Sequence, residues 1–391
     1  MAKISITGSI ARIVVARDPE TVAVDWDRLA QTATGSVYQS RAWVTAWLAA
    51  FTHDANPRGG RGAIIVAYDA ASEPLMLLAL VLERAGGFVR AQFCGGKDAN
   101  YNMALVRPDF APDASEITHM LQMARRQMQP QPDIFSLTNQ PEAFGGRPNL
   151  LAQLPHQASP SFGHCAPLQS DGAAFIASVM SKDSQKKLRR KQSRLGEIGA
   201  VTFGMAQTAH EIDECLRAFY VQKAERMHAM GLEDSFASAA MQAFLGDLSS
   251  QGRQSGVLQW YFLKCDGRII ATYAGGIWRG RFHGMVNSFD ADPLYATTSP
   301  GNLLLHWLVQ DCCTRGLRWF DLGTGEARYK SDYCEIDEAL FDLVLPVSGK
   351  GLLIAKAEQG RLHLKRAIKQ SPALWSMVKA LRSRLKGGGT R

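Results

Sequence analysis

Paired cysteines, long apolar runs and metal-ligand motifs are all missing from this chain. Its seven cysteines are odd in number and scattered, and no two are spaced as CxxC, so we expect reduced core cysteines and no metal. No run of eighteen apolar residues occurs, and residues 1–18 lack the apolar core of a signal peptide. These absences argue against a disulfide scaffold, a zinc ribbon and a membrane-spanning helix. They favour a globular cytoplasmic protein.

Charge is distributed unevenly along the 391 residues, which carry a formal net charge of +8. Residues 350–391 contain eleven of the 44 Lys and Arg residues and one acid, Glu358, so this segment carries +10 and the remainder −2. The basicity is therefore local and does not indicate nucleic-acid binding by the whole surface. The length exceeds that of one ordinary core, so we expect two domains.

The same order of elements is expected twice, although no residue-level repeat is evident. In the first half, apolar periodicity predicts strand 10–16, helices 24–32 and 37–51, strands 62–68, 75–83 and 87–94, helix 113–128 and strand 133–138. In the second half it predicts strand 200–206, helices 208–229 and 236–250, strands 257–265, 268–278 and 281–289, helix 301–315 and strand 317–322. Two copies of the order β-α-α-β-β-β-α-β indicate an α/β fold of the α+β type, with a mixed sheet in each half.

The turn Ser299-Pro300-Gly301 leads from strand 281–289 into helix 301–315. Pro300 presets φ for the first helical turn, and Gly301 lets the backbone approach whatever lies at the helix start. A helix entered this way offers unpaired N–H groups and a positive dipole end, which suits a phosphate. A plain helix cap would use the same residues, and this alternative stays open.

This turn, the Gly316…Asp321-Leu322-Gly323 run and Tyr329-Lys330 together resemble the signature of the CelD-like acetyltransferases. That group belongs to the GNAT superfamily and is related to the Fem-type peptidyl transferases, which carry two GNAT domains in tandem. The resemblance implies an acyl-CoA donor, acetyl-CoA or longer, and no metal. It also implies that the helix start receives the donor's pyrophosphate, at Ser299, Pro300, Gly301, Asn302 and Leu303. The usual GNAT loop is richer in glycine and begins with Arg or Gln, so the donor's identity stays open.

The repeated order and the resemblance together predict two tandem GNAT (acyl-CoA N-acyltransferase) units and a basic C-terminal helical tail. The expected boundaries are an N-terminal GNAT-like unit at 1–140, a connector at 141–180, a C-terminal acyltransferase unit at 181–348 and a basic amphipathic tail at 349–391.

Acyl transfer to an amine needs a base and a group that stabilises the oxyanion. The candidate bases are His283, Asp290, Asp321 and Glu326. The alternatives are a solvent-facing His283, and an Asp321 that pairs with Arg318 or Arg328.

The Tyr329-Lys330 pair matches the tyrosine-lysine motif of the resembled group. Lys330 is a candidate for anion binding or oxyanion stabilisation, and Tyr329 for protonating the leaving group. The alternative for Lys330 is an exposed lysine at a strand edge.

Acceptor-binding candidates come from three places. Asp98, Tyr101 and Asn102 follow the Gly95-Gly96 turn and resemble an acceptor-side loop of the group, although a turn alone favours Asn and Asp. Helix 181–199 carries seven positive charges within residues 182–194, and its Lys187, Arg190 and Lys191 are candidates for holding an anionic substrate or donor phosphate. A solvated linker helix is the alternative there. Arg226, near the end of helix 208–229, is the third candidate.

The tail at 352–386 is expected to form two amphipathic helices broken at Ser371-Pro372. Its apolar stripe and flanking cations suit an anionic membrane surface or an acidic partner. The alternative is a helix packed on the body of the protein with its lysines in water.

These patterns lead to an acyltransferase that moves an acyl group from acyl-CoA to an amine or hydroxyl of a sugar or surface-polysaccharide precursor. Its expected location is the cytoplasm, peripheral at the inner membrane face. The first alternative is Fem-like aminoacyl transfer from charged tRNA. The second is a non-catalytic scaffold of exopolysaccharide or cellulose synthesis. The acyl group, the acceptor and the oligomeric state stay open.

Overall fold

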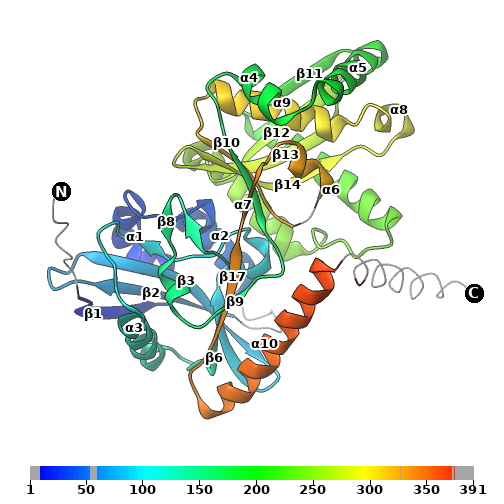
Figure 1. Ribbon diagram of the computed structural model, residues 1–391. Coiled ribbons are helices and arrows are strands. Elements are labelled where there is room, and N and C mark those ends of the chain that lie inside the picture. Colours follow the sequence, from blue (N-terminus) through cyan, green and yellow to red (C-terminus); the bar gives the residue numbers. More distant parts are fainter. Residues whose placement is uncertain (1–8, 53–59, 326, 372–373, 375–391) are drawn as a thin grey trace, which may run out of the picture. The chain divides into compact units, whose positions relative to one another are not determined.

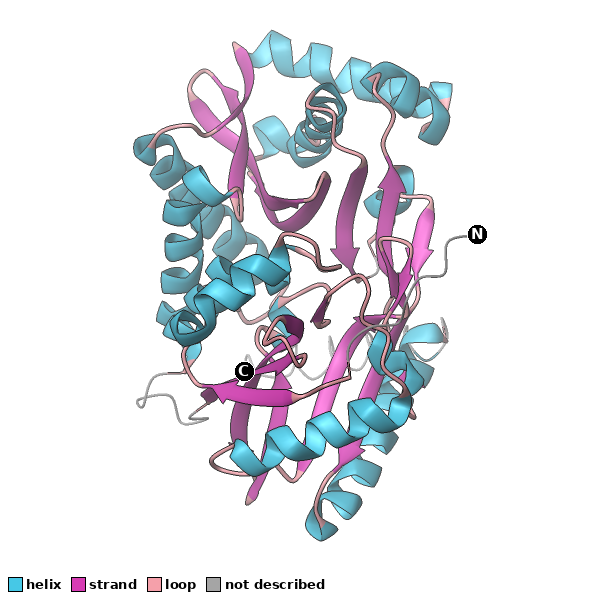
Figure 2. Ribbon diagram, turned by 90° about the vertical axis from the view of Figure 1, so that its left-hand side faces the viewer, coloured by secondary structure: helices cyan, strands magenta, loops and turns pink. Residues whose placement is uncertain are grey.

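The computed structural model describes residues 9–52, 60–325, 327–371 and 374. The chain folds into two compact units, one made of residues 1–162 and 338–391 and the other of residues 163–337 (Figure 1). We call them unit 1 and unit 2. Each contains a mixed sheet with helices against it, which confirms the expected fold class (Figure 2).

Unit 1 is built on one mixed sheet. Its strands, in spatial order, are β1 (Arg12–Ala16), β2 (Arg61–Tyr68), β3 (Pro74–Ala85), β4 (Phe88–Phe93), β6 (Ile134–Pro141), β17 (Leu340–Pro346) and β9 (Gln157–Ala158), with β5 (Leu105–Val106) paired to β3. Only the β4–β6 pair is parallel. The main helices are α1 (Ala23–Ala30), α2 (Arg41–Phe51), α3 (Ala114–Gln127) and α10 (Gly349–Gln370). The expected helix 37–51 is interrupted, because the Ser40 side chain accepts a hydrogen bond from the Trp43 amide and starts α2 there.

Unit 2 repeats this plan. Its strands, in spatial order, are β11 (Val201–Met205), β12 (Gln259–Cys265), β13 (Arg268–Trp278), β14 (Arg281–Phe289), β15 (Trp319–Thr324), β10 (Gly163–Pro167) and β16 (Ile336–Glu338). The pairs from β11 to β14 are antiparallel, and β14 and β15 are parallel. The helices are α4 (Gly172–Val179), α5 (Lys182–Ile198), α6 (Ala209–Ala229), α7 (Ala239–Ser255), α8 (Pro293–Ala296) and α9 (Pro300–Thr314).

Strand periodicity explains the layers of unit 2. Trp260 and Tyr261 are adjacent on β12, so they point to opposite faces of the sheet. Tyr261 belongs to the apolar core that α9 fills with Leu304 and its neighbours, whereas Trp260 packs edge-on against Phe219 of α6. One face of α9 is buried in this core, and the helix ends just before Gly316, which takes a positive φ of 71°.

The division of the chain differs from the expected boundaries because each sheet takes its sixth strand from beyond its own half. β17, expected in the second unit, pairs with β6 in unit 1. β10, expected in a connector, pairs with β15 in unit 2. The tail is also not separate, since Ala355 and Leu362 of α10 pack with Ile134 and Val344 in unit 1. The second expected tail helix lies almost wholly outside the described residues.

All seven cysteines are buried and lie outside any disulfide, which confirms their expected place in the core. Within the described ranges, no group of three or more His, Cys, Asp or Glu residues could hold a metal ion. No helix in the described part of the chain is long and apolar enough to cross a membrane.

Candidate active site

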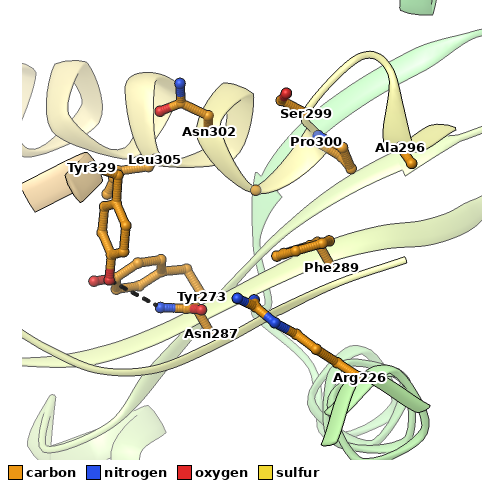
Figure 3. A pocket seen from close by; sticks show the side chains of 11 residues that line it. Arg226, Tyr273, Asn287, Phe289, Ala296, Ser299, Pro300, Asn302, Leu305 and Tyr329 are labelled. Atoms are coloured by element: carbon orange, nitrogen blue, oxygen red, sulfur yellow. Dashed lines mark hydrogen bonds between the residues drawn. The ribbon is translucent and has the colours of Figure 1, made fainter. Parts of the chain in front are cut away.

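The central feature of unit 2 is a cavity of about 310 Å³ beside the point where β14 and β15 separate. The two strands pair only from Arg281–Trp319 to His283–Asp321, and β14 then continues to Phe289 without this neighbour. The residues that line the cavity come from α6, β13, β14, α8, α9 and the loop after β15. They are Arg226, Tyr273, Asn287, Phe289, Ala296, Ser299, Pro300, Gly301, Asn302, Leu305 and Tyr329 (Figure 3).

The first turn of α9 forms one wall of this cavity. Ser299 lies in the left-handed region (φ 55°, ψ 61°), and its side chain makes no capping hydrogen bond to the helix. Pro300 has no N–H, and the amides of Asn302 and Leu303 bond to the Ser299 carbonyl. The Gly301 amide is therefore left without a hydrogen-bond partner among the described residues. An anion placed here would meet this N–H and the positive end of the helix.

Close packing explains the glycine in this turn. A Cβ added at Gly301 would lie 3.3 Å from Cδ1 of Phe289, tighter than most real contacts. The expected donor-binding residues Ser299 to Asn302 all line the cavity, whereas the Leu303 side chain is buried in the core.

One cation of the basic helix reaches this turn. The Lys191 Nζ donates a hydrogen bond to the Ser299 Oγ at 2.7 Å. Leu188 and Leu195 are buried and anchor α5. Lys187 and Arg190 are exposed on the same helix and do not line the cavity.

Tyr329 and Asn287 lie next to each other in the cavity lining (Figure 3). The Asn287 side-chain amide donates to the Tyr329 hydroxyl at 3.5 Å. Burial raises the pKa of Tyr329, with a smaller opposing contribution from the Asn287 hydrogen bond. The phenol therefore keeps its proton at neutral pH and is able to donate it.

Lys330 is buried, so its interpretation as an exposed lysine at a strand edge is wrong. Its Nζ donates to the carbonyl oxygens of Gly323 (3.2 Å) and Thr324 (2.7 Å), which ties the end of β15 to the turn that contains Lys330. Lys330 is not among the cavity-lining residues. Its catalytic role stays a prediction.

The other base candidates belong to buried polar clusters. Asp321 accepts two hydrogen bonds from the Arg281 guanidinium, at 2.9 and 2.6 Å, so its pairing with Arg318 is not observed. His283 lies 3.7 Å from the Asp321 carboxylate and is fully buried, so its solvent-facing alternative is wrong. Burial, together with the charge of Arg281, holds the pKa of His283 well below its usual value.

Asp290 is also buried, and its carboxylate pairs with Arg268 at 2.6 Å. None of His283, Asp321 and Asp290 lines the cavity. Glu326 lies outside the described residues. The base therefore stays unassigned.

The wall opposite α9 is formed by α6 (Figure 3). The Arg226 guanidinium lies 4.5 Å from the centre of the Phe289 ring, and no carboxylate pairs with it within the described ranges. Lys223, one turn earlier, donates its Nζ hydrogen bond to the Asn287 carbonyl at 3.0 Å. Burial, helped by the charge of Arg226, lowers the pKa of Lys223 to about 8. Sequence reasoning missed Lys223, although its i,i+3 spacing to Arg226 places both on one helix face.

The remaining acceptor candidates belong to unit 1 and hold its own 96–102 loop. The Asn102 side chain donates to the carbonyls of Gly96 and Thr138, both at 3.0 Å, and Tyr101 is fully buried. Asp98 accepts from the Trp47 indole at 3.3 Å, and burial raises its pKa. These contacts fit the turn interpretation, and a role in binding the acceptor stays a prediction.

One family model matches the segment of the chain that contains this cavity. Residues 182–331 match the family model described as the acetyltransferase (GNAT) domain, and this segment contains every residue that lines the cavity. The chain is an enzyme of the acyltransferase class. The comparison with curated proteins found no match.

Solved structures share the fold over most of the chain. FemX aligns with a TM-score of 0.58 at 8% identity, over 85% of this chain and 97% of FemX. A conserved protein of unknown function from Bacteroides thetaiotaomicron aligns with a TM-score of 0.53 at 14% identity, over 85% of this chain and all of that one. The C-terminal domain of a putative lysylphosphatidylglycerol synthetase from Agrobacterium fabrum has a TM-score of 0.50 at 12% identity, over 86% and 96% of the two chains. The expected likeness in fold to Fem-type transferases is thereby confirmed.

Proposed function

We propose that the chain transfers an acyl group from acyl-CoA to an amine or hydroxyl of a small acceptor that carries an anionic group, with a sugar or surface-polysaccharide precursor as the leading candidate. One observation carries the proposal. A single cavity joins an uncapped helix start, a protonated phenol and an arginine with no carboxylate partner among the described residues. The polysaccharide precursor rests on the resemblance of Ser299-Pro300-Gly301 and Tyr329-Lys330 to the CelD-like group.

The residues at the start of α9 fit an acyl-CoA pyrophosphate. The Gly301 amide, the helix dipole and the charge of Lys191 would all favour an anion at this wall. Bound acyl-CoA would supply an activated thioester. In this proposal the acceptor's nitrogen or oxygen bonds to the acyl carbon as the carbon–sulfur bond breaks, and Tyr329 gives its phenolic proton to the departing thiolate. The proton that the acceptor loses restores the phenol through solvent, and Asn287 holds the phenol in place.

Arg226 supports an anionic acceptor. A guanidinium at an apolar cavity wall recognises a carboxylate or phosphate through paired hydrogen bonds. Replacing Arg226 by Ala is expected to raise the acceptor KM by about tenfold or more, with a smaller change in kcat, because ground-state binding is lost.

The first test is thermal melting of the protein with acetyl-CoA, longer acyl-CoAs and free CoA. At ~100 times Kd, a ligand should stabilise the fold by about 2.7 kcal/mol, which is a shift of several degrees. Tyr329→Phe should keep this shift and lose turnover. If no CoA compound shifts the melting temperature, the donor assignment is wrong.

Fem-like transfer from charged tRNA is the second candidate, since α5 presents a row of exposed cations. Binding of tRNA would fall steeply with salt because several phosphate contacts release counterions, whereas CoA binding would depend on salt only weakly. Titration of both ligands across a salt series separates the two candidates.

A further inference from the structure

One face of helix α10 packs against the core of unit 1. Ala355 and Leu362 are buried with Ile134 and Val344, and Gly351 lies against the backbone of Asp133, where a Cβ would clash. Glu358 is also buried, and its carboxylate accepts from Ser136 at 2.5 Å and pairs with Arg90 at 3.0 Å. These contacts fix how the helix is rotated on the sheet.

The opposite face of α10 exposes an apolar strip. Leu353 is 75% exposed and Leu364 is 62% exposed, and both lie on this face of the helix. Exposed Ala357, Gly360 and Ala367 continue the same strip, at successive spacings of four, three, four and three residues. At 3.6 residues per turn these five positions fall within about 80° of arc and extend for about 21 Å. We call this set the α10 strip.

Cations border the α10 strip on both sides. Lys356 lies along one edge, and Lys350 and Arg361 lie along the other. The only acid on the helix is Glu358, which is buried and paired, so no carboxylate of α10 faces outward. The sequence after residue 370 adds five Lys and Arg residues and no acid.

We propose that the α10 strip docks on an anionic lipid surface, with the helix lying in the plane of the headgroups. A narrow apolar strip flanked by cations is the pattern of an interfacial helix, in which leucines enter the headgroup–acyl boundary and lysines contact anionic phosphates. The small residues between Leu353 and Leu364 let the helix lie close to a flat surface. The absence of outward acid on the helix favours a negatively charged surface as the occupant.

The test measures co-sedimentation of the full chain with vesicles. The expected result is binding to phosphatidylcholine vesicles that contain phosphatidylglycerol, little binding to pure phosphatidylcholine, and weakening as salt is raised. The double variant Leu353→Glu/Leu364→Glu should lower the partition coefficient at least about tenfold. Lys356→Glu/Arg361→Glu should lower it on anionic vesicles.

Two matched controls keep the test specific. Val24→Glu changes another highly exposed apolar residue of unit 1, on α1, and should leave binding unchanged. Lys186→Glu/Arg189→Glu removes exposed cations from α5 of unit 2 and should also leave it unchanged. All changed side chains are exposed, and circular dichroism melts of each variant check that the fold is retained.

Three results would overturn the proposal. The first is no binding of the wild-type chain to anionic vesicles at low salt. The second is binding that persists in Leu353→Glu/Leu364→Glu, which would place the contact elsewhere. The third is a dimer in sedimentation velocity, without vesicles, that this leucine variant dissociates, since the strip would then be covered by a second copy.

Discussion

The two units place a helix at the same point of the same element order, yet the starts of these helices differ in charge. In unit 1, α3 connects β4 to β6, and its first turn is closed by a capping box in which Asp113 and Glu116 accept each other's amide hydrogen bonds. In unit 2, α9 connects β14 to β15, and its first turn has Ser299 in the left-handed region, no side-chain cap and Lys191 close by.

This contrast teaches which unit is able to receive an anionic donor. Two carboxylates already occupy the donors of α3 and would repel a phosphate. The start of α9 offers an amide and a lysine instead. The match to the GNAT domain covers α9 and its cavity.

The largest expected effect comes from filling the first turn of α9. Gly301→Trp should abolish the melting shift caused by acyl-CoA, because even a Cβ at this position presses on Phe289. Ser115 holds the corresponding second position of α3, so Ser115→Trp is the matched control and should keep the shift. If Gly301→Trp keeps the melting shift caused by acyl-CoA, the start of α9 is not the donor site and does not differ from α3 in this respect.

A smaller effect is expected from the cation at α9. Lys191→Ala should weaken acyl-CoA binding by about tenfold, the usual loss for a charge-assisted contact. Lys186 is exposed on the same helix, and the hydrogen bond to Ser299 comes from Lys191 instead. Lys186→Ala should therefore leave the dissociation constant for acyl-CoA unchanged. Isothermal titration measures both affinities. An equal loss of acyl-CoA affinity in the two variants would indicate that the overall positive charge of the helix acts on the ligand, and not Lys191 in particular.

The caps should differ in their contributions to stability. Asp113→Ala should lower the free energy of unfolding by about 1 kcal/mol, since it removes a helix cap. Ser299→Ala should change it much less, because the Ser299 side chain caps nothing. Urea unfolding of both variants checks this order, and a larger loss for Ser299→Ala would contradict it.

The last effect concerns Lys223 beside the cavity. The pKa of Lys223 is about 8 in the folded state, whereas the ordinary value of 10.5 applies to the unfolded chain. Between these two pH values the unfolded chain therefore holds a proton that the folded chain has released. Stability contributed by this group therefore rises as pH increases from about 8 to 10.5. Lys223→Met should flatten this rise in melting temperature, while Arg226 and Asp234, the charges that act on Lys223, are left in place. If melting temperature changes with pH in the same way in both proteins, the pKa of Lys223 is not lowered in the folded state.

Short sequence patterns predicted much of the fold and part of the candidate site. The strands and helices of both units lie close to their expected ranges, because their apolar periods and turn residues are local features. The wall formed by Ser299 to Asn302 and Tyr329 was also anticipated from short motifs. His283 and Lys330 were harder to place, since nothing in their neighbours along the chain announces burial or partners such as Asp321 and Thr324.

By itself the sequence determined the repeated element order, the reduced buried cysteines and the turn that opens α9, because each depends on residues close together in the chain. Tertiary structure alone decided that β10 and β17 complete sheets outside their own halves, and that Arg226, Asn287 and Tyr329 meet at one cavity. The physical reason is that strand pairing and cavity lining depend on contacts between residues far apart in sequence. Such contacts form only when the sheets assemble and leave no periodic signal along the chain.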